Sequence, residues 1–128
     1  MSEKSFRFFM FFWAVCFLVV GCIFILVPHM VTALLQLPHE QSEYLWLALA
    51  GSMMMTISYL SYCAGKNPEL LVCVKAVLIC KCASSLLFIF FAWKLHNFFY
   101  LAPAAIDFPI FLLFLWAYKK RKAPCQEA

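Results

Sequence analysis

The sequence predicts an all-helical, polytopic membrane protein: an antiparallel bundle of four transmembrane helices. Of its 128 residues, 66% are hydrophobic and 12% are charged, whereas soluble domains are roughly half apolar and a quarter charged. The mean hydropathy is +0.91. The apolar residues form four continuous runs of ~20 residues, the length of helix that crosses a ~30 Å hydrocarbon layer. Continuous runs do not fit the alternating strands of a β-barrel, and they leave too little chain for a large soluble catalytic domain.

The four runs are expected to form a single membrane domain over residues 1–128. The runs cover residues 8–27, 44–63, 70–93 and 98–118. The first is uncharged and long enough to span, and Pro28 follows it, so we interpret it as a retained helix and not as a cleavable signal. Tight links at 64–69 and 94–97 make successive helices antiparallel neighbours.

The first link is long enough to hold structure of its own. Met30, Leu34 and Leu37 recur at helical spacing between Pro28 and Pro38. This spacing predicts a short helix that lies at the outer membrane interface.

The basic residues predict the orientation. One side of the membrane receives seven of them, namely Lys4, Arg7, Lys66, Lys119, Lys120, Arg121 and Lys122. The other side receives Lys94, together with Glu40 and Glu43 of the first link. Because Lys and Arg are enriched in cytoplasmic loops, we expect both termini in the cytoplasm, with a basic tail over 119–128. The protein would then lie in an inner or plasma membrane.

Two charged residues lie inside the predicted spans at matching depth. Lys81 and Asp107 are each about eleven residues from the cytoplasmic end of their helix. An unpaired ion near the bilayer centre costs at least ~2.5 kcal/mol on insertion scales, so such residues face the bundle interior and pair. We therefore expect Lys81 to contact Asp107.

Hydroxyl side chains share the predicted faces of this pair. Ser84 and Ser85 follow Lys81 on its helix, and the second run has a polar stripe. The stripe comprises Ala48, Ser52, Thr56, Tyr59 and Cys63. We expect it to face inward, because hydroxyl groups between membrane helices supply interhelical hydrogen bonds. Two interpretations stay open: a structural ion pair, or a ligand or proton site lined by Lys81, Asp107, Ser52, Thr56, Tyr59, Ser84 and Ser85.

Cysteine and histidine patterns predict neither a redox centre nor a metal site. Cys80 and Cys82 point about 160° apart on a helix, so they cannot form a disulfide. A cross-helix pair such as Cys63 with Cys73 is geometrically allowed, but it would lie on the reducing side. His39 and Glu43 match no established zinc spacing. We expect no metal, no cofactor, no catalytic residue set and no nucleic-acid partner.

The second half of the chain resembles small DoxX-like four-helix membrane proteins. The resemblance rests on Cys80-Lys81-Cys82, Ser84 to Phe88, and the stretch Ala105 to Phe111 that leads into an aromatic span end and a basic tail. Gly21, Pro28 and Asn67-Pro68 fit the same layout. Some relatives of that family are subunits of sulfur or thiol oxidoreductase assemblies that transfer electrons to quinone, so the resemblance implies a redox-linked complex.

These observations favour an accessory or scaffold subunit of a membrane complex, in contact with the bilayer and with a protein partner or further copies of itself. A lone catalytic role would rest on Lys81, Asp107 and hydroxyl groups alone, which supply no redox cofactor. One alternative is a small transporter or a binder of an apolar quinone- or sterol-like ligand at the buried polar centre. Another is an intramembrane isomerase that uses Asp107 as acid or base.

Overall fold

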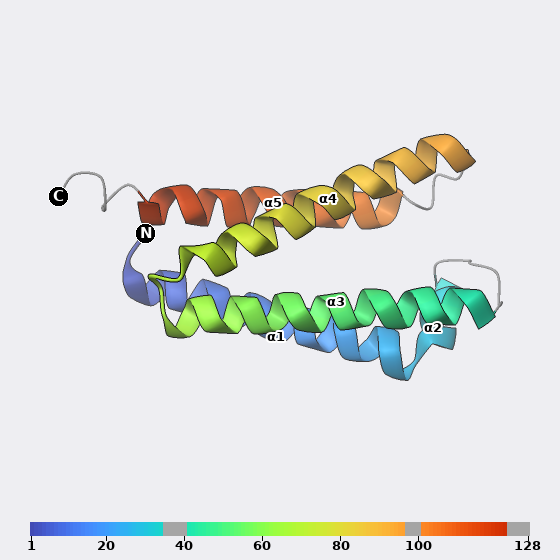
Figure 1. The fold of residues 1–128 in the computed structure, drawn as a ribbon, viewed down its shortest axis with the longest axis horizontal. Helices are drawn as coiled ribbons and strands as arrows, with labels where there is room; N and C mark the ends of the chain where they lie inside the picture. The colour runs from blue at the N-terminus through green and yellow to red at the C-terminus, as the bar shows by residue number, and fades with distance from the viewer. Residues whose placement is uncertain (35–40, 97–100, 123–128) are drawn as a thin grey trace.

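The computed structural model confirms the all-helical fold (Figure 1). It describes residues 1–34, 41–96 and 101–122. The helices are α1 (Glu3–Leu26), α2 (Pro28–Leu34), α3 (Gln41–Lys66), α4 (Leu71–Leu95) and α5 (Leu101–Lys122). Four of them, α1, α3, α4 and α5, are long and apolar enough to cross a membrane. The chain is therefore an integral membrane protein, as its composition predicts.

Local chemistry sets the residue at which α1 begins, and hydropathy alone does not locate it. Helix α1 begins five residues before the first apolar run, because the Ser2 side chain accepts a hydrogen bond from the Ser5 N–H and caps the helix. The predicted short helix is present as α2 from Pro28 to Leu34. Leu37, which was expected to continue it, lies outside the described residues.

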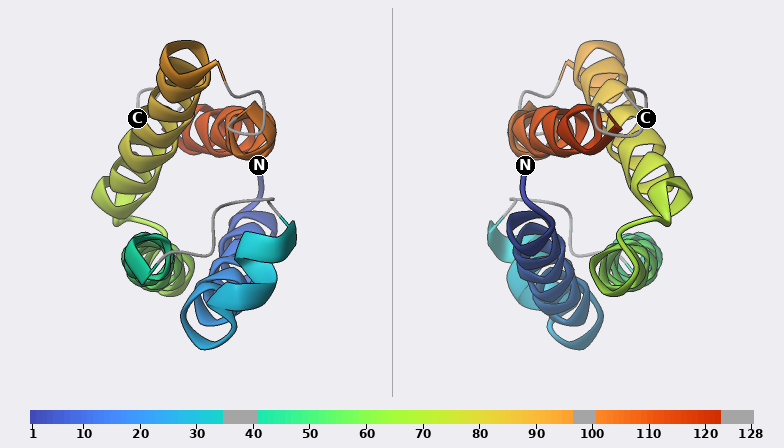
Figure 2. Two further views of the ribbon diagram at one scale, coloured as in Figure 1. Left: turned by 90° about the vertical axis from the view of Figure 1, so that its right-hand side faces the viewer. Right: turned by 90° about the vertical axis from the view of Figure 1, so that its left-hand side faces the viewer.

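The spanning helices form two hairpins. Helix α3 packs along α1 over the most extensive helix interface, and α4 packs along α5. Figure 1 shows that α1 begins and α5 ends at the same end of the bundle, which we call the termini end. The link from α3 to α4 lies at this end too. From there α4 diverges from α3, so that the two hairpins separate toward the far end (Figures 1 and 2).

A close backbone contact holds the first hairpin together. A Cβ atom built on Gly21 would lie 2.9 Å from the Gly51 carbonyl oxygen, and one built on Gly51 would lie 2.7 Å from an Ile25 side-chain carbon. Glycine at both positions therefore allows α1 and α3 to approach, as small residues do in other membrane helix pairs. The face of α3 that carries Gly51 must then point toward α1.

The apolar core that joins the hairpins is confined to the termini half. It comprises Phe6, Met10, Phe17, Ile57, Ala64, Val74, Val77, Leu78, Phe114 and Ala117. Aromatic contacts connect α1 with α5, since the Phe114 ring lies 5.2 Å from Phe9 and 6.1 Å from Phe17 between centroids. Toward the far end, the described residues of α3 before Ile57 and of α4 after Leu78 that pack against this core are Met54 and Cys80, and both are only partly buried.

The exposure of the residues along one face of α4 shows where packing against the other hairpin ends. The face is the stripe of Cys73, Val77, Cys80, Ser84, Leu87 and Phe91, which recur every three to four residues. Val77 is fully buried and Cys80 is half-buried, but Leu87 and Phe91 are 55% and 41% exposed. The first part of this face packs in the core, whereas the part beyond Ser84 is uncovered.

Helix α3 shows the same change on the face that meets the core. Its stripe comprises Trp46, Ala50, Met53, Ile57, Leu60 and Ala64. Ile57 and Ala64 are buried, whereas Trp46 and Met53 are exposed. The hairpins therefore pack closely on the termini side of Ile57 and Ser84 and are open on the other side. We call these uncovered faces of α3 and α4 the inter-hairpin opening; they carry Trp46, Met53, Leu87 and Phe91.

The glycine contact leads to a stability prediction. Gly51→Ala should lower the stability of the detergent-purified protein by about 1–3 kcal/mol, the usual cost of forcing atoms into a packed contact. The reason is that the new methyl group meets the Gly21 backbone and Ile25. Thermal unfolding followed by circular dichroism measures the change.

Gly65→Ala is the matched control. Its added Cβ would first meet the Phe11 ring at 3.1 Å, and a ring can rotate away where a backbone carbonyl cannot. The account is contradicted if Gly65→Ala destabilises the protein as much as Gly51→Ala does.

Candidate functional site

The predicted buried ion pair is present. The Lys81 Nζ lies 2.7 Å from Asp107 Oδ1, connecting α4 with α5. Lys81 is 1% exposed and Asp107 is 6% exposed. Both residues are therefore removed from the surface of the bundle, as the cost of an unpaired ion at this depth requires.

The ammonium group of Lys81 contacts all three other spanning helices. Besides Asp107 on α5, it lies 3.8 Å from the Met54 sulfur on α3 and 4.8 Å from the centroid of the Phe17 ring on α1. An aromatic ring attracts a cation through its quadrupole, by ~2 kcal/mol or more where water is excluded. The pair thus lies at the point where the two hairpins meet before they separate.

The two serines after Lys81 have different roles. The Ser84 hydroxyl lies 2.5 Å from Asp107 Oδ2, to which it donates, and 3.1 Å from the Lys81 carbonyl oxygen. Ser85 is buried and donates to the Lys81 carbonyl oxygen at 2.8 Å, within its own helix. Both oxygens of the Asp107 carboxylate therefore accept a hydrogen bond, one from Lys81 and one from Ser84. Of the two serines, only Ser84 joins the polar centre directly.

The prediction that the polar stripe of α3 faces inward is wrong. Ser52 and Thr56 are exposed, and Tyr59 is 66% exposed. These three residues do not line the polar centre. The hydroxyl groups that α3 directs into the bundle belong to Ser58 and Ser61, both of which are buried.

The close contact with α1 explains this orientation of α3. Gly51 and Ser58 face α1, where Ser58 donates to the Ala14 carbonyl oxygen at 2.7 Å. The next residue along a helix lies ~100° further around its axis, so Ser52 points away from that contact. The Ser52 and Thr56 hydroxyls also need no partner helix, because they donate to the Leu49 and Ser52 carbonyl oxygens of α3 itself.

Sequence reasoning missed two residues of the site, Met54 and Phe17. Phe17 shares a helical face with Phe6 and Met10, and this spacing indicates a buried residue but not a contact with Lys81. Met54 is the middle of three consecutive methionines. Nothing in their order distinguishes the one that reaches the ion pair.

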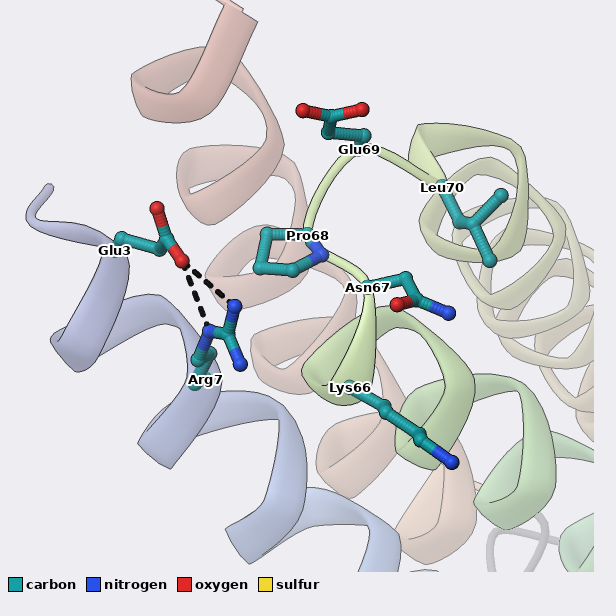
Figure 3. Close-up of a pocket in the computed structure, with 7 residues that line it drawn as sticks. All are labelled: Glu3, Arg7, Lys66, Asn67, Pro68, Glu69 and Leu70. Atoms are coloured by element: carbon teal, nitrogen blue, oxygen red, sulfur yellow. Dashed lines mark hydrogen bonds and ion pairs between the residues drawn. The ribbon is translucent and has the colours of Figure 1, made fainter.

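Other polar features of the described residues lie away from this centre. A hollow at the termini end is lined by Glu3, Arg7, Lys66, Asn67, Pro68, Glu69 and Leu70 (Figure 3). Its Arg7 guanidinium is held by Glu3, at 2.7 Å, and its charges have both signs. We assign no site to it. Within the described residues, no three His, Cys, Asp or Glu side chains are grouped as metal ligands; His39 and Glu40 lie outside them.

Comparison with protein-family models, with curated proteins and with solved structures gave no match for this chain. The resemblance to DoxX-like proteins therefore stays a prediction from the sequence. The feature of this chain that bears on function is the geometry of the polar centre.

That geometry combines a charge-balanced polar centre with an apolar opening. Lys81 and Asp107 carry opposite charges, and the partly exposed Ser84 lies between them and the inter-hairpin opening. The residues that bound the opening are apolar. Such an arrangement offers hydrogen bonds at one end of an otherwise apolar surface.

The ion pair leads to a stability prediction. Asp107→Asn should cost ~3–5 kcal/mol, because it leaves the buried ammonium group without its counter-charge. The double variant Lys81→Met with Asp107→Asn should lose less than Asp107→Asn alone, since no buried ion is left. A double-mutant cycle on the thermal stability of the purified protein measures the coupling.

Glu3→Gln serves as the control. It breaks an ion pair of the same 2.7 Å length that is exposed to solvent, and exposed pairs contribute little. If the losses from Lys81→Met and Asp107→Asn simply add, the two residues are not coupled and the assignment of the centre is wrong.

Proposed function

We propose that this protein binds an amphiphilic, lipid-like molecule between its two hairpins, with the polar end of that molecule at Lys81, Asp107 and Ser84. The observation that supports this proposal most is the position of the ion pair. It lies where the core between the hairpins ends, at the inner limit of the inter-hairpin opening. Lys81, Asp107 and Ser84 therefore place paired charges and a hydroxyl group next to the uncovered apolar faces of α3 and α4.

The dimensions of the opening suit a molecule about one leaflet long. From Ser84 to Leu95 the helix rises about 17 Å, at ~1.5 Å per residue, which is roughly half of a ~30 Å hydrocarbon layer. Leu87 and Phe91 on α4 and Met53 and Trp46 on α3 present apolar side chains along this length. Because a lipid-like molecule would come from the bilayer and not from water, its binding to these side chains would be stabilised by packing and not by the hydrophobic effect.

A second candidate is the accessory or scaffold subunit, because the same uncovered faces could be covered by a helix of a partner protein. Co-purification separates the two functions. A partner that is retained in mild detergent and lost when the opening is filled supports the subunit. A bound lipid-like molecule without a protein partner supports the binder. No described feature favours the isomerase alternative, since both oxygens of Asp107 already accept hydrogen bonds.

Filling the opening tests the proposed function. Leu87→Trp should remove most of the lipid-like molecule that co-purifies with the protein, because the larger side chain projects from the uncovered face of α4. Mass spectrometry of an organic extract measures that molecule per protein chain.

Leu86→Trp is the matched control. Leu86 is the neighbouring residue, has the same type of side chain and is similarly exposed, but it lies ~100° around the helix from Leu87. It should leave the bound molecule in place. Equal retention by both variants and the unchanged protein would contradict binding in the opening.

A further inference from the structure

The ammonium group of Lys81 is less fully hydrogen-bonded than the carboxylate of Asp107. A lysine ammonium has three N–H donors, and in the described structure one of them meets an oxygen, Asp107 Oδ1. The other neighbours are the Met54 sulfur and the Phe17 ring, and a thioether is a weak acceptor. The Asp107 carboxylate, in contrast, receives bonds on both oxygens. Besides Asp107, the Lys81 ammonium therefore has only weak partners within the polar centre.

The charge balance of the centre and its depth in the membrane restrict which chemical groups can accept a hydrogen bond from Lys81. Lys81 and Asp107 balance each other, so a ligand with a net charge would add an uncompensated ion to the centre. Lys81 lies ten residues into α4, about 15 Å along the helix at ~1.5 Å per residue, which is near the middle of the hydrocarbon layer. Ions are costly at this depth, whereas an uncharged carbonyl that finds a hydrogen bond is not. The fitting group is uncharged and accepts hydrogen bonds.

Met54 occupies the place where such a group would bind. Its side chain is half-buried and touches Lys81 from α3. Methionine is unbranched and adapts its conformation easily, so its sulfur can move aside for a stronger acceptor. The neighbouring Met53 is exposed on the uncovered face of α3, one residue from this position.

We infer that the ligand of this site is an uncharged apolar molecule with a carbonyl oxygen at one end, and that this oxygen accepts a hydrogen bond from Lys81 in place of the Met54 sulfur. The inference rests on the proposed binding between the hairpins and adds the chemical class of the ligand. A carbonyl oxygen is a stronger hydrogen-bond acceptor than the thioether sulfur that it would replace.

Three probes of equal chain length test this inference. Purified protein in detergent is incubated with hexadecyl methyl ketone, octadecane or stearate, and the complexes are counted by native mass spectrometry. The ketone should be retained about tenfold more than octadecane, the gain expected from a hydrogen bond to a charged group. Stearate should be retained less than the ketone, because its charge is not balanced at the centre.

The outcomes distinguish a failure of the carbonyl inference from a failure of the proposed function. Retention of stearate as strong as that of the ketone, or equal retention of ketone and octadecane, overturns the carbonyl inference while binding in the opening stands. If none of the three probes is retained and Leu87→Trp changes no co-purifying lipid, the proposed function itself fails.

Two variants locate the contact. In Lys81→Met with Asp107→Asn, octadecane should still bind, and the preference for the ketone should fall to about one because the donor is gone. Thermal unfolding checks that this variant is folded. Met54→Leu keeps the apolar volume but removes the sulfur, so the ketone should bind at least as well as to the unchanged protein. Weaker ketone binding by Met54→Leu would overturn the exchange of sulfur for carbonyl oxygen.

Discussion

The ion pair between Lys81 and Asp107 is the constraint on which the rest of the structure depends. Two opposite charges near the middle of a membrane-spanning bundle must meet, and their 2.7 Å contact fixes the register of α4 against α5. Contacts of the ammonium group with Phe17 and Met54 bind this hairpin to the other one. The apolar core then fills the space between the pair and the termini end, from Phe6 to Ala117.

Because the hairpins separate beyond the ion pair, the pair is a candidate binding site as well as a structural contact. If all four helices packed along their full length, the pair would have no uncovered face between the hairpins next to it. Instead, α3 and α4 diverge, and apolar side chains such as Met53 and Leu87 remain uncovered where the core ends. The polar centre is charge-balanced, the contacts of Lys81 besides Asp107 are a thioether and a ring, and an apolar surface lies next to it. This combination favours an uncharged amphiphile over an ion.

The fold and the central pair could be predicted from the sequence, because each follows from a strong local cost. Long uncharged runs must be helical in lipid, and Lys81 and Asp107 at equal depth must pair. The orientation of α3 could not be predicted from the sequence. It depends on the contact of Gly51 with Gly21, a tertiary packing constraint that overrides the pattern of hydroxyl groups. Hydroxyls such as Ser52 bond to their own helix, so a polar stripe does not by itself indicate the buried face.

The central claim is that the hairpins part beyond the ion pair, and electron–electron distance measurements in lipid bilayers test it most directly. Spin labels are placed on a cysteine-free background at two pairs of exposed positions that connect α3 with α4: Tyr62 with Val72 at the termini end, and Leu45 with Trp93 at the far end. The account predicts a clearly longer mean distance for Leu45 with Trp93. Equal distances for the two pairs would indicate a closed, parallel-sided bundle and would contradict it.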